Sequence, residues 1–121
     1  MAGVRVIVTL NFPTPEVADQ AVGGMVQAFK PVKDEPGAVQ YELFRSVEDP
    51  RRVILMEHWA SRELYDQHWL KQMREQGGPD QEQAKMLNPT FEFYPHADYT
   101  LVDQIWEPLD PAQRLKTIRW A

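Results

Sequence analysis

The feature that most constrains this chain is a pair of predicted strands, 39–47 and 53–59, whose two alternating faces are both apolar. Successive side chains of a strand point to opposite faces of the sheet. The larger apolar set is Val39, Tyr41, Leu43, Val53, Leu55 and Trp59, and the opposite set is Phe44, Ile54 and Met56. We therefore expect helices to cover one face of the sheet and a second copy of the chain, as a homodimer, to cover the other.

The segments around this pair predict two helices and further strands. Residues 4–10 alternate as a strand, and Thr14, as N-cap before Pro15, begins a helix that Pro31 ends. Ser61 caps a second helix, a short helix is expected over 80–87, and residues 91–105 contain strand-like stretches. The order matches an α+β fold, the ferredoxin-like split βαβ arrangement with an antiparallel sheet.

The length of 121 residues indicates about one domain. We expect this domain to span residues 1–107 and residues 108–121 to form a C-terminal arm. Residues from about 99 onward are expected to reach a partner protomer, since Trp120 is an unusual residue to leave in water. In the first helix, Gly23-Gly24 costs roughly 1 kcal/mol each relative to Ala, and close packing against another backbone is the simplest explanation.

Composition excludes several classes of protein. The absence of cysteine removes disulfide scaffolds, cysteine-ligated zinc and thiol nucleophiles. A formal charge of −5 without clustered Lys and Arg argues against nucleic acid as a partner. No apolar run is long enough to span a membrane, and no secretory signal is evident, so a cytoplasmic location is expected. The aromatic content of 11% suits a pocket for a flat apolar ligand.

An ordered series of short motifs over 36–68 resembles the antibiotic biosynthesis monooxygenase family. The series is Pro36-Gly37 entering a strand, Tyr41-Glu42-Leu43, the turn Glu48-Asp49-Pro50, Glu57-x-Trp59, Ser61-x-Glu63-Leu64, and His68 nine residues after the Trp. The resemblance is close over about a quarter of the chain and looser over about 80 residues. It implies a dimeric α+β barrel of two ferredoxin-like protomers, commonly with strand exchange at the C-terminus.

The resemblance also implies a chemistry, because some members oxidise quinols, anthrones and similar polyphenols with O2 and no bound metal or flavin. An electron-rich phenolate or carbanion can itself pass an electron to O2, so the protein need only deprotonate, orient and desolvate the substrate. Other relatives degrade haem. However, those usually carry Trp at the position of His68, and their haem-ligating His lies later in the helix, where this chain has polar residues.

Such a site needs an aromatic wall, a base and a donor to the developing anion. We expect Trp59 and Tyr41 to form the wall and His68 to act as the base, with Glu57 and Asn11 as further catalytic candidates. Leu43, Leu55 and Leu64 share the inward phase and complete the expected substrate-binding surface.

Each of these residues also has a structural interpretation. Trp59 can be a core residue, and His68 a hydrogen-bonded structural imidazole. Glu57 can pair with an Arg or cap backbone amides, and Asn11 can be part of a turn before Pro13. No metal site is expected, since no HxH or HExxH spacing exists and His58 alternates away from Trp59.

The sequence therefore favours a cofactor-independent monooxygenase or oxidase acting with O2 on a small aromatic substrate. The alternatives are a non-catalytic dimeric binding protein of the same fold, and an aromatase or cyclase of polyketide-like intermediates.

Overall fold

The alternating pattern of residues 4–10 becomes the strand β1, to which the rest of the sheet is added. A computed structural model describes residues 3–76 and 85–109. Its elements are β1 (Val4–Asn11), α1 (Pro15–Phe29), the 3₁₀ helix η1 (Lys30–Asp34), β2 (Ala38–Arg45), β3 (Arg52–Trp59), α2 (Arg62–Gln76), β4 (Thr90–Pro95), β5 (Tyr99–Val102) and β6 (Ile105–Pro108). The strands β1 to β4 form one antiparallel sheet in the order β2-β3-β1-β4. This confirms the predicted α+β class with an antiparallel sheet.

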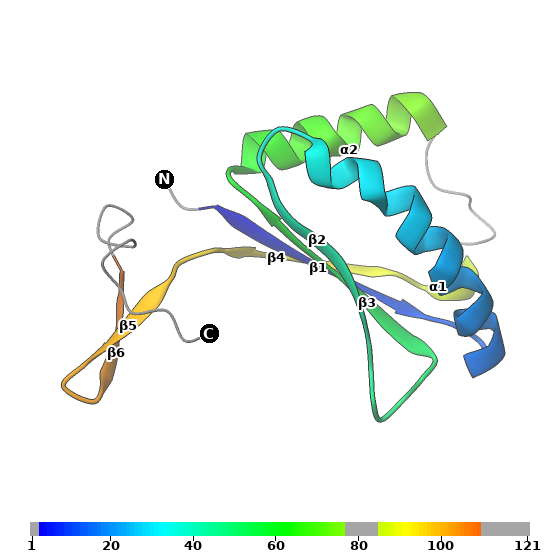
Figure 1. The fold of residues 1–121 in the computed structure, drawn as a ribbon, viewed down its shortest axis with the longest axis horizontal. Helices are drawn as coiled ribbons and strands as arrows, with labels where there is room; N and C mark the ends of the chain where they lie inside the picture. The colour runs from blue at the N-terminus through cyan, green and yellow to red at the C-terminus, as the bar shows by residue number, and fades with distance from the viewer. Residues whose placement is uncertain (1–2, 77–84, 110–121) are drawn as a thin grey trace.

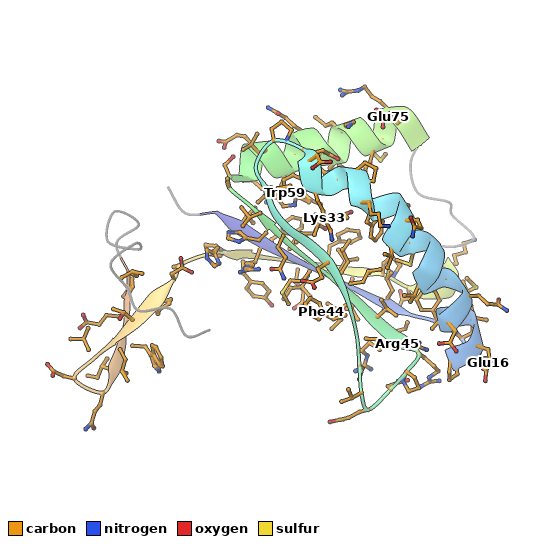
Figure 2. The ribbon with its side chains drawn as sticks, in the orientation of Figure 1. Glu16, Lys33, Phe44, Arg45, Trp59 and Glu75 are labelled. Carbon is orange, nitrogen blue, oxygen red and sulfur yellow. The ribbon has the colours of Figure 1, made fainter. Side chains whose placement is uncertain are left out.

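Both long helices cover the same face of this sheet (Figure 1). On β1 the residues Val4, Val6, Val8 and Leu10 are buried beneath them, as the period of two predicted. Figure 2 shows Trp59 on the helix side of the sheet and Phe44 on the other side. Trp59 is fully buried and Phe44 is 44% exposed, so the two faces have different environments in one protomer.

The helix starts follow the predicted capping chemistry. Thr14 accepts a hydrogen bond from the backbone N–H of Val17 through its Oγ1, at 3.1 Å, and Pro15 occupies the first helical position. The Ser61 hydroxyl accepts from the backbone N–H of Leu64 at 3.2 Å. These two caps fix where α1 and α2 begin relative to the strands that precede them.

Val39 departs from the prediction because β2 contains a bulge. Ala38 pairs with Trp59 and Gln40 pairs with His58, which leaves Val39 as an extra residue between them. The alternation therefore shifts, and Val39 is 59% exposed rather than buried beside Tyr41. The predicted strand also ends earlier, at Arg45, and Val47 lies fully exposed in the turn.

The glycines of α1 also differ from expectation. A Cβ atom built on Gly23 or Gly24 would have nothing within 4 Å among the described residues, so no close backbone contact explains them. Gly37 is the glycine that the fold requires. Its φ is +80°, and a Cβ there would overlap the Leu64 side chain, because the turn before β2 packs directly against α2.

The sheet face away from the helices is partly apolar at its centre. Ile7, Ile54 and Met56 are half-buried there and Phe44 is exposed, whereas Arg5, Gln40, Glu42 and Glu92 surround them. The two-sided apolar pattern of the sequence is therefore present, with a polar border that alternation alone did not indicate.

After β4 the chain forms a separate β5–β6 hairpin that extends away from the sheet (Figure 1). The sequence suggested strand material over 99–106, but Asp103 and Gln104 adopt φ of 50° and 70° and turn the chain back. Leu101, Ile105 and Trp106 are all more than half exposed on this hairpin. An isolated two-stranded hairpin is at best marginally stable in water, so this one needs a surface to pack on.

Two of the predicted segments fall largely beyond the described part of the chain. Residues 85–87 are helical, in agreement with the end of the short helix expected over 80–87, but the rest of that helix lies outside the description. Residues 110–121 of the expected arm, including Trp120, also lie outside it. Within the residues described, neither long helix combines the length and apolar character that crossing a membrane requires.

The glycines give a first testable prediction. Gly23→Ala and Gly24→Ala should each raise the free energy of unfolding by about 0.5–1 kcal/mol, because alanine loses less backbone entropy and meets no neighbour. Gly37→Ala should lower it by about 1–3 kcal/mol through the left-handed backbone and the collision with Leu64. Urea unfolding of the three variants at equal protein concentration measures both effects. An unchanged free energy of unfolding in Gly37→Ala would contradict this prediction, because it would show that the turn can adjust to the added Cβ without cost.

Candidate functional site

A cavity of about 220 Å³ lies between the helices and the buried face of the sheet. Apolar side chains supply most of its lining: Val8, Leu10, Met25, Phe29, Leu55, Trp69 and Phe91. The polar side chains are Tyr41, Glu57, Tyr65, His68 and Gln72. Since most ionisable side chains are exposed in proteins, a buried Glu and a buried His on one cavity are the features that need explaining.

The sheet register and a short connection bring the polar residues together. Tyr41 and Glu57 are direct cross-strand partners on β2 and β3, so both point to the helix side. Only Ala60 and Ser61 separate the end of β3 from α2. His68 therefore lies within the first two turns of a helix that starts beside the Glu57-x-Trp59 strand end.

Glu57 is 3% exposed and its Oε1 accepts a hydrogen bond from Trp59 Nε1 at 2.8 Å. Burial raises the pKa of Glu57 from its ordinary 4.5 to about 7, and the hydrogen bond from Trp59 offsets this only in part. The ion pair that sequence reasoning allowed for Glu57 is not found among the ion pairs of the described residues. Glu57 is therefore a carboxyl group that can hold or release a proton near neutral pH.

His68 is 3% exposed and is held on two sides. Its ring stacks on Trp59 with centroids 4.7 Å apart and planes at 30°, and its Nδ1 lies 3.0 Å from Glu35 Oε1. A carboxylate can only accept, so the Nδ1 proton is donated to Glu35 and the tautomer with a free Nε2 is favoured. This leaves Nε2 as the ring nitrogen without a carboxylate partner, and the His68 side chain forms part of the cavity lining.

Glu35 is a residue of the candidate site that sequence reasoning missed. It lies in the turn after η1, 33 positions before His68, and belongs to no helical or strand period. The one sequence feature that could have indicated Glu35 is its position directly before Pro36-Gly37, where the family-like series of motifs begins.

Tyr41 and Tyr65 add two phenols to this group. Tyr41 contacts His68 edge-on at 5.4 Å and Trp59 at 6.3 Å between centroids, and Tyr65 contacts Trp59 at 6.3 Å. Burial, followed by the nearby Glu57 carboxylate, raises the pKa of Tyr41 well above its ordinary value and that of Tyr65 to about 12. Both phenols are therefore neutral and can donate hydrogen bonds at physiological pH.

The structure brings together some of the predicted site residues and leaves others apart. His68, Glu57, Tyr41 and Leu55 line the cavity, while Trp59 lies behind them and supports both His68 and Glu57. Leu43 and Leu64 pack on the core without lining the cavity. Asn11 is exposed at the end of β1, where its Oδ1 accepts from Arg52 Nε at 3.3 Å, away from the other candidates.

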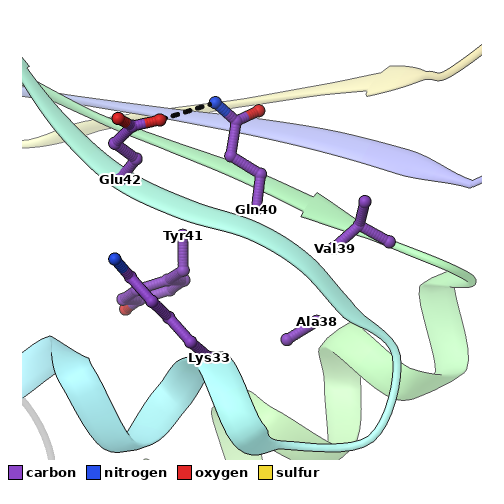
Figure 3. Close-up of a pocket in the computed structure, with 6 residues that line it drawn as sticks. All are labelled: Lys33, Ala38, Val39, Gln40, Tyr41 and Glu42. Carbon is purple, nitrogen blue, oxygen red and sulfur yellow. Dashed lines mark hydrogen bonds between the residues drawn. The ribbon is translucent and has the colours of Figure 1, made fainter.

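A second cavity, of about 240 Å³, lies along the edge strand β2 (Figure 3). Lys33, Val39 and Glu42 on its wall are exposed, and Gln40 Nε2 donates to Glu42 Oε1 at 3.0 Å. Tyr41 is the one buried side chain in its lining. The lining of this second cavity contains no buried carboxyl or imidazole group, so the cavity beside Glu57 and His68 is the candidate functional site.

The remaining histidines occupy the other side of the sheet. The rings of His58 and His96 lie 4.1 Å apart between centroids, and His96 Nδ1 accepts from Arg5 Nε at 3.1 Å. In the described segments no three His, Asp or Glu side chains gather as metal binding would require.

The raised pKa of Glu57 predicts how stability depends on pH. Between about pH 4.5 and 7 the unfolded chain ionises Glu57 while the folded chain keeps the proton, so rising pH favours unfolding. Glu57→Gln removes this effect and can still accept from Trp59. At pH 4.5 the free energy of unfolding of Glu57→Gln should equal that of wild type. At pH 8 it should be higher than that of wild type by up to about 3 kcal/mol.

Urea unfolding across this pH range, at one protein concentration, measures the difference. Glu48→Gln, in the exposed turn between β2 and β3, is the matched control and should show little change. If the difference in free energy of unfolding between wild type and Glu57→Gln does not vary with pH, the raised pKa of Glu57 is contradicted.

Comparison with known proteins agrees with this architecture. The model of the family described as Antibiotic biosynthesis monooxygenase matches residues 4–70, which is more than half of the chain. No curated protein matches significantly. Solved structures match at the level of fold: a protein from Shewanella oneidensis has a TM-score of 0.63 at 16% identity, covering 78% of this chain and 91% of its own. A candidate antibiotic biosynthesis monooxygenase from Deinococcus radiodurans has 0.60 at 19%, covering 82% and 97%, and one from Caulobacter crescentus has 0.58 at 22%, covering 80% and 92%. The family match covers all residues of the cavity lining except Gln72 and Phe91. The chain therefore belongs to the antibiotic biosynthesis monooxygenase family.

Proposed function

We propose that this chain is a cofactor-independent monooxygenase or oxidase that uses O2 on a small aromatic substrate of the quinol or anthrone type. The observation that carries the proposal is His68, whose Nδ1 is bound to Glu35 and whose side chain lines a largely apolar cavity. An imidazole held in this way is a suitable general base for a phenolic hydroxyl.

The cavity supplies the other requirements of such a reaction. Its lining is mostly apolar, which favours displacement of water by a bound aromatic ring, and Tyr41, Tyr65 and Glu57 offer hydrogen bonds to the oxygen that becomes negative. Once deprotonated, the electron-rich ring can pass an electron to O2 without assistance from a metal or flavin. The protein's role is then to position, deprotonate and desolvate the substrate.

Cavity size favours substrates of one or two rings. An engineered apolar cavity of about 150 Å³ holds benzene, and the cavity here is about 220 Å³. A monocyclic or bicyclic hydroquinone should therefore bind better than a tricyclic anthrone, and it is the first substrate to test.

Substitution of His68 tests the mechanism. His68→Gln should lower the rate of O2 consumption with a hydroquinone by about 10²–10⁴-fold while the fold is retained. Glu35→Gln should also lower kcat, since an amide that donates to Nδ1 would place the proton on Nε2, the wrong tautomer. An oxygen electrode measures the rates, and circular dichroism checks the fold.

His96→Gln, on the opposite side of the sheet, is the matched control and should consume O2 at the wild-type rate. Undiminished O2 consumption by folded His68→Gln would remove His68 from the mechanism. No O2 consumption by wild type with hydroquinones or anthrones would favour the alternatives, a binding protein or an aromatase or cyclase.

The partner that we propose for this protein is a second copy of itself. The partly apolar sheet face and the exposed β5–β6 hairpin both need a cover, and one homodimer can supply both. Leu101 and Trp106 pair across one face of the hairpin, so together they present the largest apolar surface that it offers.

Sedimentation at micromolar concentration should therefore give twice the chain mass of 14.1 kDa. The double variant Leu101→Ser/Trp106→Ser should raise the dimer dissociation constant by at least tenfold, whereas Glu107→Gln on the other face of the hairpin should not. A stable wild-type monomer, or a double variant with unchanged affinity, would contradict the assembly.

A further inference from the structure

Glu57 and His68 have contrasting hydrogen-bond environments on the same cavity. Among the described residues, the only hydrogen bond to the Glu57 side chain comes from the neutral indole of Trp59, and no cation pairs with it. A buried carboxyl group without a positive neighbour favours its protonated form. His68 has the reverse environment, because the Glu35 carboxylate binds its Nδ1 and leaves Nε2 as an acceptor.

One side chain holds this acid and this base in place. The indole of Trp59 stacks on the His68 ring at 4.7 Å and donates to Glu57 Oε1 at 2.8 Å. That hydrogen bond uses one oxygen of Glu57, so the other oxygen is the one that can carry the proton. Trp59 is completely buried, so neither group can move far without disturbing the core.

We propose that this cavity also catalyses the enolisation of small cyclic ketones without O2, with His68 as the base and Glu57 as the acid. The proposal shares His68 with the proposed oxidase but needs no oxidant. Its chemical basis is that a carbon next to a carbonyl loses a proton far more readily when the carbonyl oxygen receives a proton or hydrogen bond at the same time.

The step balances within the site. His68 Nε2 takes the proton from the carbon next to the carbonyl, and the electron pair of that C–H bond forms the new C=C bond. The C=O π electrons move to the oxygen, which takes the proton of Glu57. The product is the enol, with His68 cationic and Glu57 anionic. The reverse step returns a proton to carbon and restores both groups.

The cavity limits the class of ketone. Its volume of about 220 Å³ suits one or two rings, and its apolar walls favour a hydrocarbon body with a single carbonyl. Tyr41 and Tyr65, which are neutral phenols on the same wall, can donate to that oxygen together with Glu57. A ketone with charged substituents would find no counter-charge on the described wall apart from the Glu57–His68 group.

Two anaerobic measurements on the full-length protein test the proposal. The first follows deuterium uptake at C1 of 2-tetralone in deuterated buffer by proton NMR. The second follows the isomerisation of 3-cyclohexen-1-one to its conjugated isomer by ultraviolet absorbance, which registers turnover even when His68 returns the same proton. Wild type should exceed the buffer rate at least tenfold in one or both reactions.

Variants assign the roles. Glu57→Gln and His68→Gln should each lower the enzymatic rate at least tenfold, while Glu48→Gln should leave it unchanged. Circular dichroism establishes that each variant is folded, and His68→Gln decides the outcome alone if Glu57→Gln does not fold. Wild-type rates no greater than those of folded His68→Gln in both reactions would overturn the proposal.

The same preparation is assayed separately for O2 consumption with a hydroquinone. Ketone turnover without O2 consumption would support the enolisation and contradict the oxidase. O2 consumption without ketone turnover would contradict the enolisation and leave the oxidase standing.

Discussion

The packing of Trp59 is the interaction on which the rest of the site depends. This residue ends β3, pairs with Val4 of the central strand, and is completely buried. Its ring face supports His68 and its N–H holds Glu57, so one side chain satisfies both a packing and a polar requirement. A buried indole usually needs a partner for its N–H, and here the partner is a carboxyl group that would otherwise be alone in the core.

This arrangement also explains why the two interpretations of Trp59 and His68 do not exclude each other. Trp59 is a core residue by burial and a supporting residue of the site by contact. His68 is a hydrogen-bonded imidazole, as the structural interpretation required, but only its Nδ1 is satisfied by Glu35. The proposed chemistry at the cavity depends on the second nitrogen, because Glu35 already binds the first.

Much of the fold could be predicted because local periodicity and tertiary burial agree. The strands and helices appear in the expected order. Tyr41 and Glu57 share a face because the register of β2 and β3 is regular after the bulge, so their side chains alternate as predicted. Prediction failed where one residue changes the phase or the direction of the chain. Val39 enters a bulge, and Asp103-Gln104 forms a tight turn without the Asn-Gly or Asp-Gly sequence that usually indicates one.

Several residues predicted for the site lie together when they belong to regular elements, whereas Glu35, a loop residue beside them, was not predicted. Glu35 reaches His68 only because Gly37 allows the turn to pack against α2, and such a contact has no period in sequence. Asn11, predicted for the site from its place at a strand end, instead lies apart from the cavity and accepts a hydrogen bond from Arg52. Side chains that act through tertiary contacts require the packed structure for their assignment.

The bulge in β2 has a consequence for how the sheet can grow. β2 and β4 are the two edges of the four-stranded sheet, and each leaves one row of backbone donors and acceptors open along the described chain. At Val39 the spacing of that row on β2 is broken, so an additional strand cannot pair with its full length in one register. β4 is regular in its pairing with β1 from Thr90 to Pro95. Extension of the sheet is therefore asymmetric. The bulged edge strand β2 disfavours pairing with an additional strand, whereas the regular edge strand β4 can pair with one.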